Sequence, residues 1–108
     1  MLPKKNRVDK KNIDLIFKTG KFVVSPNLTF KFLLTNHKTP PQISCIAPKS
    51  IAKLAVKRNL LRRRGYTALG KYINQFPAGL LGALVFKKYQ DDISILEDEI
   101  KNILNKIN

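Results

Sequence analysis

The stretch from Ala55 to Tyr66, Ala-Val-Lys-Arg-Asn-Leu-Leu-Arg-Arg-Arg-Gly-Tyr, is the part of the sequence that most needs explanation. Five of these twelve residues are basic, yet the apolar residues in and around the stretch recur at helical spacing. On a helix that advances about 100° per residue, one stripe holds these apolar residues: Ile51, Leu54, Ala55, Leu61, Leu69, Tyr72, Ile73 and Phe76. The spacing therefore predicts one long amphipathic helix over residues 51–76, with Ser50 as its N-cap.

Two arginines of this stretch fall on or near the apolar stripe. Arg58 lies in its middle, and Arg62 lies about 40° to one side. A desolvated charge without a partner costs several kcal/mol, so both positions need a reason. One explanation is that their stems cover apolar surface while their heads reach water. The other is that this half of the helix extends beyond the core, where the arginines face an external polyanion such as phosphate.

Length and charge indicate the class of protein. The 108 residues are 44% hydrophobic, which is enough to bury the core of one domain over residues 1–108. The formal net charge is +14, and residues 1–88 hold 19 Lys and Arg against two acidic residues. So much positive charge on one domain repels itself unless a polyanion neutralises it, and nucleic acid is the leading candidate for that partner. Without a long apolar run or a recognisable signal sequence, the chain is expected to be cytoplasmic and to engage no membrane.

The periodicity of the remaining segments predicts a helix over Lys10–Lys18, strands over Lys21–Ser25, Leu28–Thr35, Gln42–Ala47 and Leu80–Tyr89, and a final helix over Asp92–Ile107. This order, αβββαβα, predicts an α+β fold: a two-layer sandwich of helices on a four-stranded sheet.

Three details of the pattern carry further expectations. In the second strand, one face is apolar and is expected to meet a helix: Leu28, Phe30, Phe32 and Leu34. The alternate face is more polar and is expected to be open: Thr29, Lys31, Leu33 and Thr35. Gly65 and Gly70 inside the helical pattern predict close packing or a bend.

In the last helix, Asp91 and Asp92 are expected to cap the N-terminal end, and the acidic residues are expected to form a solvated face.

Catalytic side chains are scarce. The chain has one His, one Cys and seven carboxylates, so no nucleophile–base pair and no metal site is expected. Cys45 lies in a predicted strand and is expected to be a small buried apolar residue, and His37 is expected in a surface loop. The sequence favours a binding protein without catalytic residues of its own.

The order of elements and the motif Ala55-Val56-Lys57-Arg58-Asn59-Leu60-Leu61-Arg62-Arg63 resemble the bacterial ribonuclease P protein component. The signature of that family is a basic loop followed by Ala-Val-x-Arg-Asn-x-x-(Lys/Arg)-Arg on a helix after the third strand. The N-terminal segment Leu2-Pro3-Lys4-Lys5 and the end of the first helix, Phe17-Lys18-Thr19-Gly20, are also similar to the family. The resemblance covers nearly the whole chain.

The resemblance implies the small basic subunit of a ribozyme that removes the 5′ leader of precursor tRNA. RNA and its Mg²⁺ would carry the chemistry, and the protein alone would bind no cofactor. The expected partners are the catalytic RNA and precursor tRNA, and without RNA the protein is expected to be a monomer. The family fold also contains a left-handed βαβ crossover, against the usual hand.

The resemblance assigns two groups of site residues. The signature helix and the preceding loop would contact the catalytic RNA: Lys49, Lys53, Lys57, Arg58, Asn59, Arg62, Arg63 and Arg64. A cleft between the first helix and the open face of the sheet would receive the leader: Ile13, Phe17, Thr29 and Lys31.

The chain departs from the family pattern at several positions. Tyr66 stands where the family usually has a further Arg, Ile13 where it has a Phe, and Lys31 where it often has an aromatic residue. The loop at Pro48-Lys49-Ser50 also has one extra residue relative to the usual pattern. With Phe17 as the one clear aromatic residue, leader binding is expected to depend more on charge.

Two other functions are compatible with the sequence. One is a ribosomal or general RNA-binding protein with a related sandwich, because the site and not the fold decides function. The other is a nuclease that acts alone, which would need a metal or an acid–base set.

Overall fold

The computed structural model describes residues 8, 10–36 and 38–107 of the chain, so His37 lies outside the described residues. The helices are α1 (Lys10–Thr19), α2 (Ala55–Gly70), the short 3-10 helix η2 (Ile73–Gln75) and α3 (Ile93–Ile107). The strands are β1 (Lys21–Val24), β2 (Leu28–Leu34), β3 (Gln42–Ile46) and β4 (Leu80–Phe86). The predicted order αβββαβα is confirmed.

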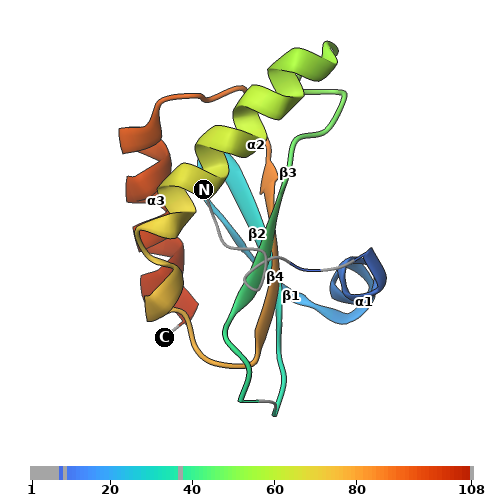
Figure 1. Cartoon of the computed structure of the whole chain (residues 1–108), viewed down its shortest axis with the longest axis vertical. Coiled ribbons are helices and arrows are strands. Elements are labelled where there is room, and N and C mark those ends of the chain that lie inside the picture. The colour runs from blue at the N-terminus through green and yellow to red at the C-terminus, as the bar shows by residue number, and fades with distance from the viewer. Residues whose placement is uncertain (1–7, 9, 37, 108) are drawn as a thin grey trace.

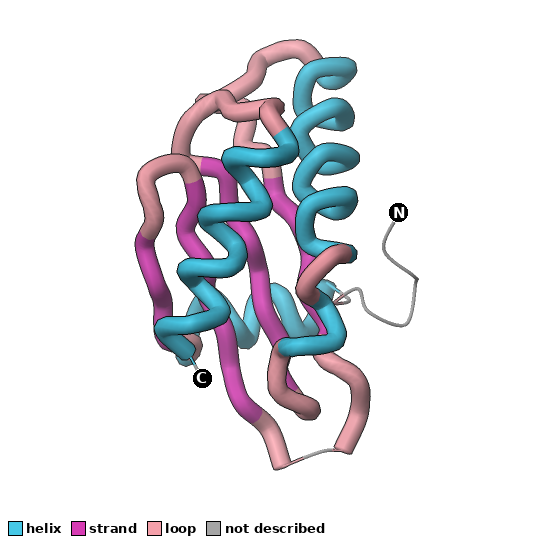
Figure 2. Tube along the Cα trace, turned by 90° about the vertical axis from the view of Figure 1, so that its left-hand side faces the viewer, coloured by secondary structure: helices cyan, strands magenta, loops and turns pink. Residues whose placement is uncertain are grey.

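The four strands form one mixed sheet in the order β1-β2-β4-β3. The pairs β1–β2 and β2–β4 are antiparallel, whereas β3 and β4 are parallel and α2 connects them. In Figure 2, β3 rises at the right of the sheet, α2 descends in front of it, and β4 rises to the left of β3. A crossover of this sense is left-handed, as the resemblance implies, whereas nearly all such units are right-handed.

Two helices cover one face of the sheet and one covers the other (Figure 1). Helices α2 and α3 pack against the first face and form the predicted sandwich. The main core between them holds these fully buried side chains: Leu28, Phe30, Ile43, Leu61, Leu69, Leu84, Phe86, Leu96 and Ile100. Helix α1 lies on the opposite face, where Val8, Ile16 and Ala83 form a smaller buried cluster.

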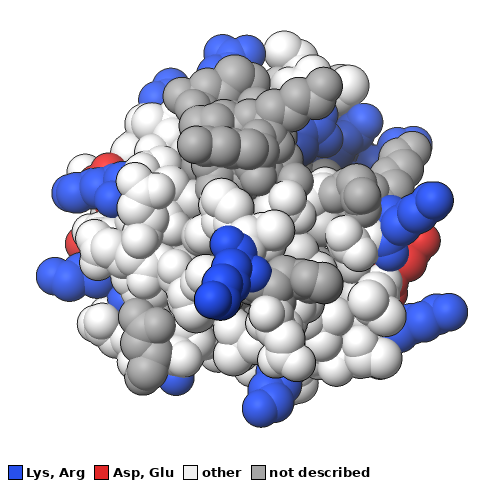
Figure 3. All heavy atoms as spheres, turned by 60° about the horizontal axis from the view of Figure 1, so that its bottom comes forward, with Lys and Arg blue, Asp and Glu red and all other residues white. Residues whose placement is uncertain are grey.

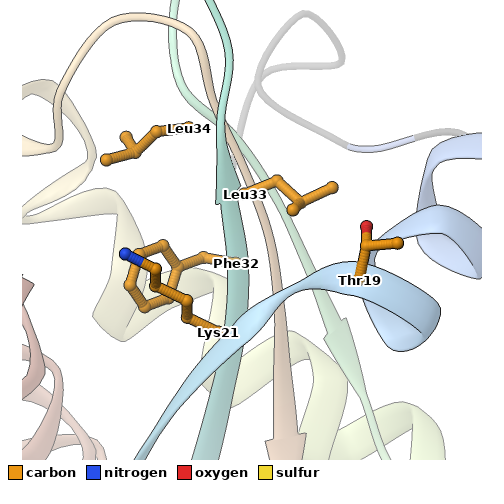
Figure 4. Close-up of a pocket in the computed structure, with 5 residues that line it drawn as sticks. All are labelled: Thr19, Lys21, Phe32, Leu33 and Leu34. Carbon is orange, nitrogen blue, oxygen red and sulfur yellow. The ribbon is translucent and has the colours of Figure 1, made fainter.

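The alternation of β2 is confirmed except at its end. Leu28, Phe30 and Phe32 are buried on the side of α2 and α3. Leu34 points to the same side as Phe32 (Figure 4) but is 58% exposed, because it is the last residue of the strand.

The long predicted helix over residues 51–76 is wrong at its start. Helix α2 begins at Ala55, and its N-cap is Leu54, whose backbone is extended, so Ser50 is not the cap. The preceding residues form a turn in which the amides of Ile51 and Ala52 donate to the Pro48 carbonyl oxygen at 3.0 and 3.2 Å. This turn buries Ala52 and half-buries Ile51, so both still contribute to the core without being helical.

The predicted helix is also too long at its end. Helix α2 stops at Gly70, and the chain continues through a turn into η2. The change of direction buries Ile73 and Phe76 against the sheet, where the Phe76 ring lies 5.8 Å from the Phe30 ring between centroids. The apolar residues at both ends of the pattern therefore pack into the core from outside α2.

Gly65 brings α2 close to the sheet. A Cβ atom at this position would lie 3.0 Å from Cys45 Sγ and 3.3 Å from Phe86 Cζ. Cys45 is buried, as expected, and lies in β3, whereas Phe86 ends β4. The close packing predicted for Gly65 is confirmed, whereas Gly70 marks the end of the helix.

Helix α3 is fixed to the β1–β2 turn by a buried carboxylate. Glu99 is 6% exposed, and its Oε1 accepts from Ser25 Oγ at 2.5 Å and from the Asn27 amide at 2.8 Å. Its Oε2 accepts from Asn27 Nδ2 at 2.5 Å. The expectation of a solvated acidic face is therefore wrong for Glu99, because three donors replace its water. Asp92 behaves as predicted, since its Oδ1 accepts from the Ser94 amide at 2.9 Å and caps the helix.

The close packing at Gly65 predicts a difference between two glycine substitutions in one helix. Gly70→Ala should be neutral or stabilising by up to about 1 kcal/mol, because alanine has the higher helix propensity and no described atom lies within 4 Å of its Cβ. Gly65→Ala should be less stable than Gly70→Ala by about 1–3 kcal/mol, because its methyl group overpacks the sheet. Urea unfolding gives both free energies, and the cost of Gly65→Ala should fall in a Cys45→Ala background. Equal stability of the two variants would contradict the close packing.

Candidate nucleic-acid interface

Seven basic side chains lie along the β3–α2 loop and the first turns of α2, and we call them the basic surface: Lys49, Lys53, Lys57, Arg58, Arg62, Arg63 and Arg64. No acidic residue occurs between residues 49 and 64. The start of α2 extends beyond the ends of the strands (Figure 1), and the first fully buried residue of the helix is Leu61. The predicted overhang of this half of the helix is therefore present in the structure.

Arg58 joins the start of α2 to the loop before it. Its Nη1 donates to the backbone carbonyl of Ala52 at 3.1 Å and to that of Lys53 at 2.8 Å. The side chain is half-buried, and neither of the two explanations from sequence included this contact. A guanidinium group has five N–H donors, so Arg58 can hold the loop and still offer donors to an external anion.

The neighbouring residues of the signature are arranged by helical spacing. Arg62 Nη2 donates to Asn59 Oδ1 one turn earlier, and this bond fixes the direction of the Arg62 head group. Arg63 and Arg64 are exposed. Arg62 is half-buried, so its stem covers part of the helix while its head remains near the surface.

The basic surface has no internal counter-charge. Among the described residues, the one salt bridge joins Lys71 Nζ to Glu97 Oε1 at 3.8 Å, and it lies at the far end of α2. The repulsion between the cations of the basic surface is therefore not relieved within this part of the chain. A polyanion would relieve it, which makes phosphate the chemistry that fits.

The second predicted group lies on the opposite side of the sheet, at α1. Lys31 Nζ lies 4.8 Å from the centroid of the Phe17 ring, and Phe17 is 42% exposed. Thr29 is half-buried on the same face of β2, two residues before Lys31. Ile13 instead packs into the small core under α1. The structure thus brings Phe17, Thr29 and Lys31 together, and it gives Ile13 a packing role.

Phe22 belongs to the same face and was not predicted. It lies opposite Lys31 in the register of β1 and β2, and it is 65% exposed. In Figure 4, Lys21 points to the side of Phe32, so by strand alternation Phe22 points to the side of Leu33 and α1. The alternation of Lys21–Val24 was visible in the sequence, but the facing residue depends on the pairing with β2.

The described residues also line open pockets at the surface. One is lined by Thr19, Lys21, Phe32, Leu33 and Leu34, and Figure 4 shows that these side chains lie on both sides of β2. Figure 3 shows the molecule with the bottom of Figure 1 turned forward. Lys and Arg side chains stand mostly around the edge of this view, and blue side-chain atoms also project near its centre among uncharged residues. The basic surface lies at the other end, at the start of α2.

Comparison with known proteins gives the family. The model of the family described as Ribonuclease P matches residues 2–108. The chain belongs to the ribonuclease P protein family. The family is the protein partner of ribonuclease P RNA in tRNA processing, and this assignment was expected from the signature on α2.

Solved structures of ribonuclease P proteins share the fold. The protein from Thermotoga maritima is 18% identical, with a TM-score of 0.81 over 94% of this chain and 97% of that one. The protein from Staphylococcus aureus is 13% identical, with a TM-score of 0.81 over 97% of both chains. A comparison with curated protein sequences gives no match.

Tyr66 shows what one departure from the family signature does in this ribonuclease P protein. Its hydroxyl oxygen accepts a hydrogen bond from the Cys45 amide at 3.2 Å. β3 is an edge strand of the sheet, and this contact links its backbone to α2. The side chain at this position therefore supports the sheet, whereas the exposed arginines before it face outward.

Membrane spans and metal clusters are both absent from the described residues. No described helix has the length and apolar character needed to cross a bilayer. No group of three or more His, Cys, Asp or Glu side chains in the described part of the chain is arranged to hold a metal ion.

The contacts of Arg58 predict that its removal loosens the loop. Arg58→Met keeps an apolar stem and removes the donors to Ala52 and Lys53, which should lower the free energy of unfolding by about 1 kcal/mol. Amide hydrogen exchange at Ile51 and Ala52 should become faster, because their turn loses its support. Arg63→Met is the matched control, since Arg63 is exposed and should leave exchange unchanged. Unchanged exchange in Arg58→Met would show that the loop does not depend on this arginine.

Proposed function

We propose that the chain is the protein subunit of ribonuclease P, which binds the catalytic RNA and the 5′ leader of precursor tRNA and assists removal of that leader. The observation that carries the proposal is the basic surface. Its seven cations extend from the core on α2 and the preceding loop, without an acidic residue between residues 49 and 64. Membership of the ribonuclease P family supports RNA as the polyanion.

The proposed contacts with the catalytic RNA follow from the geometry of the basic surface. The exposed side chains Lys49, Lys53, Lys57, Arg63 and Arg64 would contact phosphates as separate charges. Arg62, oriented by Asn59, would offer its planar fork. Arg58 would act in two ways, by holding the loop that carries Lys49 and Lys53 and by donating its remaining N–H groups.

The leader would bind on the α1 side of the sheet. Phe17 offers an exposed ring, Lys31 a positive charge and Thr29 a hydroxyl group, which together suit a single strand. Ile13 would support the position of α1 beside this face, because it packs against the small core under that helix. The two RNA surfaces then lie on different elements and on opposite faces of the sheet.

The chemistry would belong to the RNA with its Mg²⁺. Among the described residues no three His, Cys, Asp or Glu side chains come together, and in this proposal the RNA holds the Mg²⁺. The protein would bind and orient the RNA substrates. We further propose that it is a single RNA-binding domain, a monomer without RNA, and located in the cytoplasm.

Reconstitution tests this function. The protein is mixed with a bacterial ribonuclease P RNA at low Mg²⁺, and cleavage of precursor tRNA is measured. We expect the protein to increase cleavage at the 5′ end of the mature tRNA, with no cleavage by the protein alone. A protein that binds RNA non-specifically and leaves ribozyme cleavage unchanged would contradict the proposal and favour a general RNA-binding role.

The number of phosphate contacts predicts the salt dependence of assembly. If five to seven cations of the basic surface contact phosphates, log affinity for the catalytic RNA should fall with log salt with a slope of about −4 to −6. Filter binding across a series of salt concentrations measures this slope. Removing Lys57 should weaken the slope by roughly 0.7–0.9, because one contact is lost. A slope near −1 would contradict the basic surface as the interface.

A further inference from the structure

Phe17, Lys31 and Phe22 form a row across three elements, which we call the aromatic row. Phe22 and Lys31 are directly opposite in the antiparallel register of β1 and β2, so their Cβ atoms are about 4.5–5.5 Å apart. The Lys31 ammonium group lies 4.8 Å from the centroid of the Phe17 ring. The Lys31 side chain therefore contacts the ring from α1 and has the Phe22 residue of β1 as its cross-strand neighbour.

Both rings are open to solvent. Phe17 is 42% exposed and Phe22 is 65% exposed, whereas the inward residue of β1, Val23, packs against the main core. The Phe22 ring therefore does not contribute to the packing of the core. An exposed aromatic ring on an edge strand also favours association with other molecules, so its exposure carries a cost. A ligand that covers the ring would account for this exposure.

The combination of groups selects the ligand. An ammonium group attracts an anion, and aromatic faces stack on planar bases. The bases of a duplex already stack on each other, so two separate rings favour an unpaired strand. An apolar peptide or a second copy of the chain would cover the rings but would leave the Lys31 charge without a partner.

We propose that the aromatic row binds one nucleotide step of single-stranded RNA, with one base on Phe17, the next base on Phe22 and the phosphate between them at Lys31. The inference rests on the proposed binding of the leader and names the residues that hold it. It replaces the expectation that Phe17 is the one aromatic contact. In this chain, β1 supplies at Phe22 the ring that β2 lacks at Lys31.

Two substitutions of Phe22 separate stacking from apolar contact. Phe22→Leu keeps an apolar side chain and removes the aromatic face. Phe22→Trp keeps a ring, and because the chain contains no Trp it also introduces a single fluorescent reporter. Val24→Ala is the matched control, since Val24 is an exposed apolar residue on the same face of β1 and has no ring.

The affinity of the reconstituted holoenzyme is measured for precursor tRNA with and without a leader. Phe22→Leu should weaken binding of the leader-bearing tRNA by roughly 5- to 150-fold, the range expected for loss of one stacked base. Leaderless tRNA should bind as before, and Val24→Ala and Phe22→Trp should keep the preference for the leader. A short oligoadenylate should quench the indole fluorescence of the Phe22→Trp variant, and a base-free ribose phosphate of equal length should not.

The outcomes distinguish this inference from the proposed function. If Phe22→Leu binds the leader normally while Phe17→Ala and Lys31→Ala lose affinity, the role of Phe22 is wrong and the leader face stands. If none of the three variants changes leader affinity, the proposed leader face itself is wrong. If Phe22→Leu abolishes a concentration-dependent dimer seen by sedimentation and leaves leader binding intact, a second copy of the chain covers the ring and the inference is overturned.

Discussion

The position of α2 depends on how closely the helix approaches the sheet at Gly65. Without a side chain there, the helix backbone lies against Cys45 of β3 and Phe86 of β4. The buried residues of α2 follow from this contact, because they lie on the same face and begin at Leu61: Leu61, Gly65, Ala68 and Leu69. The residues of α2 before Leu61 extend past the ends of the strands (Figure 1). The first half of α2, which carries the basic side chains, is therefore exposed because the second half packs on the sheet.

The acidic residues of α3 do not compensate the positive charge at the start of α2. Glu97 pairs with Lys71, which follows the end of α2, and Glu99 accepts hydrogen bonds from the β1–β2 turn. Glu99 has a structural role, since both of its carboxylate oxygens accept hydrogen bonds from the β1–β2 turn. The interactions that hold α3 in place therefore involve no cation of the basic surface.

The sequence predicts the order of elements because each segment has a clear period. It predicts the basic surface because seven cations and no acidic residue lie between residues 49 and 64. The ends of α2 could not be predicted, since Ile51, Ile73 and Phe76 continue the helical period while lying in turns or in η2. The burial of Glu99 depends on donors at Ser25 and Asn27, which are distant in sequence. The place of Phe22 beside Lys31 depends on strand pairing, which the alternation of β1 alone does not fix.

We propose that two faces of this small protein contact two different RNAs, and site-specific photo-crosslinking distinguishes the two contacts. A photoreactive phenylalanine analogue replaces Val56, which is 69% exposed on the first turn of α2, or Phe22 on β1. In the reconstituted complex, the probe at Val56 should react with the catalytic RNA whether or not precursor tRNA is present. The probe at Phe22 should react with the leader, and only when precursor tRNA is bound. Reaction of the Val56 probe with the leader, or of the Phe22 probe with the catalytic RNA alone, would contradict the account.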